Sequence, residues 1–229
     1  MKIYIEKKLF LAYNFLDEIK FYNKSKLIWF EKRKEIRMSK IIPVGLSNKH
    51  VHLSQADVET LFGEGHQLTP IKDLGQPGQY ACDEKVDLVG PKRTIKDVRV
   101  LGPARKVSQV ELSFSDGITL GLGEIPVKDS GMLDGTPGIK LVGPKGEVNL
   151  QQGVIAAARH IHMHTSDAAE FGVKDKDLVK VPVEGQRGLV FDNVLIRVHE
   201  TYALEMHVDI EEGNAAGLKN CQLVELIKK

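Results

Sequence analysis

The chain has 229 residues, of which 42% are hydrophobic, enough for a sizeable core in one large domain or two small ones. Its 32 Lys and Arg nearly balance 31 Asp and Glu, and the net charge of +1 argues against nucleic acid as a partner, because phosphate binding needs a clustered basic surface. The longest early apolar stretch, residues 9–16, is far shorter than the roughly 18 apolar residues of a membrane span, so no span is expected.

Two further features predict a cytoplasmic location. Asp17, Glu18 and Lys20 close that apolar stretch without the small-residue cleavage site of a secretory signal. Cys82 and Cys221 form no CxxC pair and are expected to be free thiols in a reducing compartment.

Residues 1–38 differ in composition from the remainder. They hold ten of the Lys and Arg, five of the Asp and Glu, and eight of the aromatic residues, but no Gly or Pro. Apolar residues at spacings of three and four predict an amphipathic helix that fades near residue 23; they are Ile5, Leu9, Ala12, Tyr13, Leu16 and Ile19. Two interpretations stay open. Either this stripe docks on the body or on a partner, or the extension is a mis-assigned start and the protein begins at Met38.

The body, residues 39–229, alternates short strand-like runs with glycine turns, which favours sandwiches or barrels over a doubly wound sheet. The expected strands are Ile41–Leu46, Val86–Val89, Val98–Leu101, Gln109–Phe114, Ile118–Leu122, Ile139–Val142, Leu178–Val183, Val194–Val198 and Gln222–Ile227. Short helices are expected at Gln55–Phe62, Gln152–Ala158 and Ser166–Phe171.

A motif that occurs twice divides the body into two related halves. Lys49-His50-Val51-His52-Leu53, followed by Asp57, matches Arg159-His160-Ile161-His162-Met163, followed by Asp167. In an extended strand the side chains at i and i+2 point the same way, so both histidines of each pair can reach one ion. Two such pairs in matched surroundings predict two metal sites.

Each pair needs a further ligand, and two residues are candidates. Glu111 and His207 both lie inside otherwise apolar runs. A buried ionised carboxylate is costly unless it is paired or binds a cation. The alternatives are an outward-facing strand position for Glu111 and a hydrogen-bonded core histidine for His207.

A series of motifs in chain order resembles one known family. It comprises Ser47-Asn48-Lys49-His50-Val51-His52-Leu53-Ser54, Lys72-Asp73-Leu74-Gly75-Gln76-Pro77-Gly78-Gln79-Tyr80, Val100-Leu101-Gly102-Pro103-Ala104-Arg105, Gln109-Val110-Glu111, Ala158-Arg159-His160-Ile161-His162-Met163, Phe191-Asp192-Asn193-Val194 and Tyr202-Ala203-Leu204-Glu205-Met206-His207. Together these closely resemble the PduL-type phosphate propanoyltransferases, the phosphotransacylases of bacterial microcompartments. The resemblance covers residues 40–229 and leaves out the first 38.

The resemblance implies a mainly β fold of two small β-barrel domains capped by short helices, in addition to the N-terminal amphipathic helical extension. One barrel would comprise residues 39–48 with 158–229, and the other residues 49–157. Two Zn²⁺ per chain would be held by His50, His52 and Glu111 and by His160, His162 and His207. Arg105 would hold phosphate. Ser47, Lys72, Arg99, Leu101 and Asn214 match positions that contact coenzyme A or phosphate in the family. His164 departs from the usual Thr.

The implied reaction interconverts a short-chain acyl-CoA (propanoyl-CoA or acetyl-CoA) and phosphate with acyl phosphate and CoA. The family also suggests a homodimer, propanediol degradation, and a location inside a bacterial microcompartment, with residues 1–38 binding shell or cargo proteins. Two other classes stay open: a dinuclear zinc hydrolase of a thioester or phosphate ester, and a non-catalytic zinc-stabilised module associated with a shell.

Overall fold

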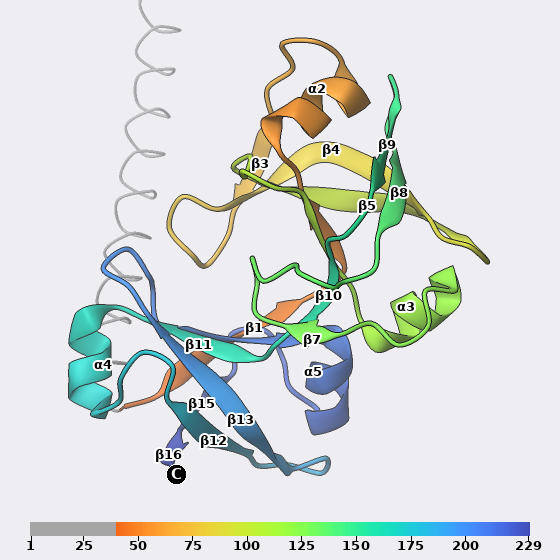
Figure 1. Cartoon of the computed structure of the whole chain (residues 1–229). Helices are drawn as coiled ribbons and strands as arrows, with labels where there is room; N and C mark the ends of the chain where they lie inside the picture. Colours follow the sequence, from red (N-terminus) through yellow and green to blue (C-terminus); the bar gives the residue numbers. More distant parts are fainter. Residues whose placement is uncertain (1–39) are drawn as a thin grey trace, which may run out of the picture. The chain divides into compact units, whose positions relative to one another are not determined.

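The computed structural model describes residues 40–229, and the predicted helix in residues 1–38 lies outside this range. The described chain is mainly β, with four short helices (Figure 1). Its helices are α2 (Gln55–Phe62), α3 (Phe114–Leu120), α4 (Thr165–Phe171) and α5 (Ile210–Ala216). No helix among these residues is long and apolar enough to cross a membrane.

The strands form two strongly curled, half-barrel sheets. One sheet has the order β15-β1-β14-β11-β13-β12-β16. Its strands are β1 (Ile42–Ser47), β11 (His160–Met163), β12 (Leu178–Val183), β13 (Leu189–Val198), β14 (Glu205–Asp209), β15 (Leu223–Val224) and β16 (Ile227–Lys228). The predicted barrels are therefore not closed, and each is observed as a curled sheet with a strand at either edge.

The second sheet has the order β7-β10-β6-β2-β5-β4-β8-β9, with β3 paired to β4. Its strands are β2 (His50–His52), β3 (Pro70–Asp73), β4 (Tyr80–Val89), β5 (Thr94–Gly102), β6 (Gln109–Glu111), β7 (Val127–Lys128), β8 (Ile139–Val142), β9 (Glu147–Leu150) and β10 (Val154–Ala157). Each sheet encloses its own apolar cluster, of which Ile161 and Val51 are fully buried members.

The chain crosses between the sheets at matching points. Strand β1 pairs with β14 and β15 in the first sheet, so in Figure 1 the orange β1 lies among blue strands. The next strand, β2, belongs to the second sheet. Strand β10 likewise belongs to the second sheet, whereas β11 returns to the first. Both crossings occur directly before a His-x-His strand.

Two sequence expectations fail for identifiable reasons. Residues 118–122 were expected to form a strand, but α3 occupies Phe114–Leu120 because Ser113 and Asp116 form a capping box at its start. Residues 152–158 were expected to be helical, but Val154–Ala157 form β10, which pairs in parallel with β6 and with β7. Three of its four residues are buried, so burial between two strands outweighs the helix propensity of alanine.

Two turns with the sequence Val-Gly-Pro-Lys, residues 89–92 and 142–145, have a structural role that the sequence pattern did not predict. In one, the Lys92 N–H donates to the carbonyl of Leu120 at 2.9 Å, and in the other Lys145 N–H donates to Leu61 at 3.0 Å. Both acceptors lie near the ends of helices, where carbonyls lack intrahelical partners. A Cβ on Gly90 would stand 2.3 Å from the Leu120 carbonyl oxygen, so only glycine permits this approach.

Candidate metal centre

Strand pairing brings each third candidate ligand opposite a His-x-His pair. In the second sheet β2 and β6 are antiparallel, with His50 opposite Glu111. In the first sheet β11 and β14 are antiparallel, with His160 opposite His207. Because directly opposed residues on antiparallel strands project to the same face, the three side chains of each set converge.

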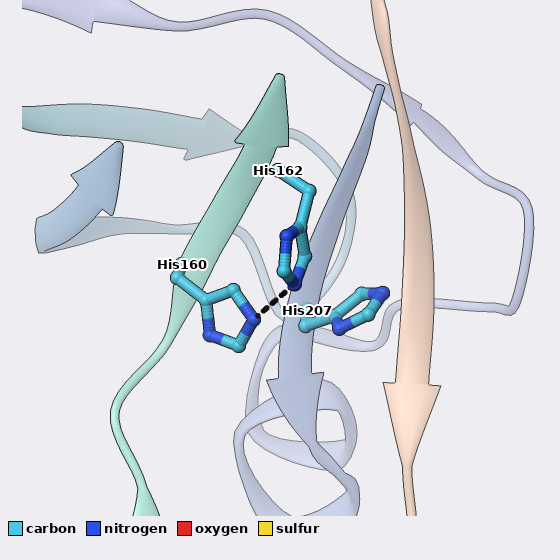
Figure 2. Close-up of side chains that lie close together, drawn as sticks. All are labelled: His160, His162 and His207. Atoms are coloured by element: carbon cyan, nitrogen blue, oxygen red, sulfur yellow. Dashed lines mark hydrogen bonds between the residues drawn. The ribbon is translucent and has the colours of Figure 1, made fainter. Parts of the chain in front are cut away.

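The convergence produces two compact clusters of candidate metal-binding atoms. His50, His52 and Glu111 form one, and His160, His162 and His207 form the other; within each cluster the candidate ligand atoms lie within 4.8 Å of one another. We call these the first and the second cluster. Figure 2 shows the second, in which two histidines from β11 and one from β14 point toward a common centre.

Distances within the clusters suit a shared cation. The Nε2 atoms of His160 and His162 are 2.9 Å apart, close to the separation of about 3.3 Å expected for two nitrogens bound tetrahedrally to one zinc. In the first cluster, Glu111 carboxylate oxygens lie 3.4 Å from His50 Nε2 and 3.8 Å from His52 Nε2.

Backbone carbonyls orient several of the imidazoles. His50 Nδ1 lies 2.7 Å from the Asn48 carbonyl oxygen, and His160 Nδ1 lies 2.8 Å from the equivalent Ala158 carbonyl. A proton fixed on Nδ1 leaves the Nε2 lone pair for a metal. His162 differs, because its buried Nδ1 has no hydrogen-bond partner.

A carboxylate orients the third ligand of the second cluster. Glu205 Oε2 lies 2.8 Å from His207 Nε2, which leaves Nδ1 as the other ring nitrogen. Glu205 also accepts a hydrogen bond from Gln76 Nε2 at 3.3 Å. Gln76 is buried and exchanges two more hydrogen bonds with the backbone of Ala203, so it anchors the second sheet against the strand that carries His207.

The first cluster has an amide at the equivalent position. Gln109 lies opposite His52, as Glu205 lies opposite His162. Its Nε2 donates to Glu111 Oε1 at 2.6 Å. Each cluster therefore holds one carboxylate, which is a candidate ligand in the first and a support for a ligand in the second.

The pKa values favour the protonation states that bind metals. Burial, with the neighbouring histidines, lowers the pKa of His160 to about 4 and of His162 to about 2. Burial and the charges of His50 and Arg105 lower the pKa of His52 to about 3. These imidazoles are neutral at pH 7 and offer lone pairs to a cation.

Glu111 and His50 stabilise each other's charged forms, which lowers the pKa of Glu111 and raises that of His50. Burial opposes ionisation of Glu111, but His50, His52 and Arg105 outweigh it and hold the pKa of this carboxyl well below its usual range. Burial likewise opposes protonation of His50, but the Glu111 carboxylate outweighs it and raises the pKa of His50. The first cluster thus holds a largely buried, ionised carboxylate, and such a charge is costly unless a positive group lies beside it.

Arg105 lies against the first cluster. Its guanidinium is 2.9 Å from His52 Nε2 and donates to Ser130 Oγ at 3.1 Å. Its backbone N–H donates to the Leu53 carbonyl at 2.8 Å, which ties the arginine loop to the residue after the His-x-His pair. Burial lowers the pKa of Arg105.

The structure places the other predicted contact residues on several different elements. The Leu101 carbonyl lies 3.3 Å from His52 Nδ1, and Ser47 ends β1, one residue before Asn48. Lys72 is exposed on β3, while Arg99 on β5 donates to the carbonyls of Cys82 and Asp83. Asn214 is exposed on α5.

The two halves match beyond the histidines. The basic residue before each His-x-His pair binds an acidic residue in a helix capping box: Lys49 pairs with Asp116 at 3.1 Å and Arg159 with Glu212 at 2.8 Å. Each helix follows directly after the strand that carries the third ligand. His164, the departure from the family pattern, caps α4 rather than joining a cluster.

The site also contains residues that sequence reasoning missed. The Tyr202 ring lies 4.3 Å from the His162 ring, centroid to centroid, and the Arg197 guanidinium lies 6.0 Å from the Tyr202 ring centroid. Gln109, Ser130 and Glu205 were not singled out either. A polar residue two positions before each third ligand was the available signal for Gln109 and Glu205, since strand periodicity puts them on the same face.

Two groups of three candidate metal ligands, the first of them beside the half-buried Arg105, are typical of catalytic rather than closed structural metal sites. The comparisons with known proteins also indicate that the protein is an enzyme. The family model described as "Phosphate propanoyltransferase" matches residues 43–219.

Curated relatives with that same description are similar over most of their length. The protein from Thermotoga maritima is 60% identical over 188 residues, covering 82% of this chain and 89% of the relative. Those from Salmonella typhimurium and Clostridioides difficile are 54% and 50% identical, covering 78% and 85% of this chain and 85% and 92% of the relatives. The protein is therefore an acyltransferase. It belongs to the phosphate propanoyltransferase family, as its motifs predicted.

Proposed function

We propose that the protein interconverts a short-chain acyl-CoA and phosphate with acyl phosphate and CoA, using one zinc ion at each cluster. The observation that carries this proposal is the placement of Arg105, 2.9 Å from the His52 nitrogen of the first cluster, in a chain of the phosphate propanoyltransferase family. The arginine offers a fixed fork of donors to phosphate beside a candidate metal group.

The ligand types favour zinc among the common divalent ions. Five imidazoles and one carboxylate make up the two clusters, and nitrogen ligands suit zinc better than calcium or magnesium. Zinc bound there would supply a Lewis acid for the thioester carbonyl and affinity for the departing thiolate.

The residues of this chain would then position and neutralise the reactants. A phosphate oxygen attacks the carbonyl carbon of the thioester, the C–S bond breaks, and CoA leaves as a thiolate. Arg105 keeps its positive charge at neutral pH and holds the phosphate oxygens in line with that carbon. Phosphate is already anionic, so no strong side-chain base is needed. Transfer is direct, without an acyl-enzyme; trapping of an acylated protein from acyl-CoA alone would contradict this step.

Several finer features belong to the same proposal. Ser47, Lys72, Arg99, Leu101 and Asn214 contact coenzyme A or phosphate. Residues 39–48 with 158–229 form one domain around the first sheet, and residues 49–157 form the other around the second sheet. The strand membership of the two sheets supports that division.

The assembly and location of the protein are also proposed from the family. It forms a homodimer in the cytoplasm, within a bacterial microcompartment that degrades propanediol. Residues 1–38 bind the shell or neighbouring cargo. Expression from Met38 tests this role, because encapsulation that is unchanged without the extension would contradict it.

A coupled assay separates the alternatives. The zinc-loaded protein is supplied with phosphate and a panel of acyl-CoAs, and free CoA, acyl phosphate and free acid are each quantified. The proposal predicts acyl phosphate in equal amounts to CoA, with propanoyl-CoA or acetyl-CoA the best substrate. Free acid without acyl phosphate would indicate the hydrolase instead, and no turnover would indicate the structural module.

Arg105→Ala provides a second test of the same site. Removing the guanidinium should reduce turnover greatly while zinc content stays near two per chain, because the arginine is not itself a ligand. Loss of zinc from this variant would show that the role of Arg105 is misassigned.

A further inference from the structure

A second arginine, Arg197, lies beside the second cluster. It is on β13, which runs parallel to β11, and its register partner there is His162. Register partners on neighbouring strands project to the same face, so the Arg197 side chain shares the face of the metal-binding histidines. Its guanidinium lies 6.0 Å from the Tyr202 ring centroid, and this ring packs edge-on against His162.

Arg197 and Arg105 come from different sheets, and each lies beside one of the two clusters. The two guanidinium groups therefore flank the clusters, with Arg105 beside the first and Arg197 beside the second.

Within residues 40–229, Arg197 has no carboxylate partner and makes no hydrogen bond through its guanidinium; its ring contact is with Tyr202. Arg105 also lacks a direct ion pair in this part of the chain, since its bonds go to a serine hydroxyl and an imidazole. Each of these half-buried positive charges has lost part of its hydration without gaining a carboxylate partner. An anion bound beside the arginines would offset that cost.

We propose that Arg197 is a second phosphate-binding residue, which together with Arg105 holds the phosphoryl group of inorganic phosphate or acyl phosphate across the two clusters. This deepens and rests on the proposed function. Each guanidinium fork binds two phosphoryl oxygens in a plane, and the three terminal oxygens of a phosphoryl group suffice for two forks because one oxygen can accept from both. Tyr202 is a positioning residue, because its ring supports the Arg197 guanidinium from the side of His162.

The experiment compares Arg197→Gln and Arg197→Lys with the zinc-loaded wild-type protein. Arg93→Gln is the matched control, because Arg93 is exposed in the turn between β4 and β5. KM for phosphate, KM for acyl-CoA and zinc content are measured for each, and binding of inorganic phosphate is measured by calorimetry without acyl-CoA.

Loss of one charge-assisted contact should raise KM and Kd for phosphate roughly tenfold to a hundredfold in Arg197→Gln. Arg197→Lys keeps the charge without the fork and should fall between this variant and the wild type. KM for acyl-CoA, zinc content and all values for Arg93→Gln should stay near wild type.

Three outcomes would overturn the inference. Unchanged phosphate binding in Arg197→Gln would mean that Arg197 does not contact phosphate. A raised KM for acyl-CoA alone would place the residue at the phosphates of CoA. Loss of zinc or of folding in both variants would make its role structural. If instead the wild-type protein releases free acid and no acyl phosphate, the proposed function itself fails, and phosphate calorimetry still tests the anion site independently.

Discussion

The contact between Glu205 and His207 makes a specific prediction about metal affinity. Glu205 Oε2 lies 2.8 Å from His207 Nε2 and only a fifth of its side chain is exposed, so the bond is charge-assisted and partly shielded from water. Glu205→Gln keeps the shape and the contact but removes the charge. Glu205→Ala removes the contact altogether.

The expected loss follows from the strengths of these bonds. A hydrogen bond to a charged group contributes about 1.5–3 kcal/mol and a neutral one about 0.5–1.5 kcal/mol, so the glutamine variant loses about 1–1.5 kcal/mol. Each 1.4 kcal/mol is about a factor of ten in affinity. We therefore expect the second cluster to bind zinc about tenfold more weakly in Glu205→Gln and up to about a hundredfold more weakly in Glu205→Ala.

Competition with a chromophoric chelator measures this loss for each ion separately. One zinc per chain should leave the variants at lower chelator concentration, while the other is held as in the wild type. Glu200→Gln is the control, because Glu200 is exposed and lies five residues earlier on the chain. Equal weakening of both ions, or no weakening, would refute the reasoning that Glu205 orients His207 alone.

Three further predictions concern a core side chain, a helix cap and the two cysteine thiols. Ile161→Ala removes a fully buried side chain between the two β11 histidines and should lower the free energy of unfolding by about 2–5 kcal/mol. Ile118→Ala, at an exposed position, should change it by less than about 0.5 kcal/mol. Equal losses for the two variants in urea unfolding would contradict this prediction. Ser113→Ala removes the cap of α3 and should cost about 1 kcal/mol in the same assay, so an unchanged midpoint would contradict the capping role. Burial raises the pKa of the Cys82 thiol to about 11, so a thiol reagent at pH 8 should label exposed Cys221 first; equally fast labelling of both would contradict this order.

Local sequence signals predicted the two His-x-His strands well. A spacing of two residues was enough to place His50 with His52, and His160 with His162, on one face of short strands, and the structure places both pairs in that way. The short helices expected at Gln55–Phe62 and Ser166–Phe171 also lie close to those observed, α2 and α4. These features depend on residues that lie within a few positions of one another in the sequence.

The errors arose where distant pairing decides the structure. Val154–Ala157 has helix-favouring alanines, but its pairing with β6 and β7 makes it a strand, and no local signal records those partners. Arg197 was missed for the same reason, since its place beside His162 depends on the register of β13 against β11, 35 residues apart on the chain. The third ligands were recognised only as candidates, because their convergence is likewise a matter of register.

Stepwise return of zinc to metal-stripped protein tests the central claim most directly. The chain is stripped with a chelator, its fold is checked by circular dichroism, and acyl phosphate formation from propanoyl-CoA and phosphate is followed as zinc is added. The account predicts negligible turnover at first and a rise that ends at two equivalents per chain, one for each cluster. Full turnover by the stripped, folded protein would contradict it.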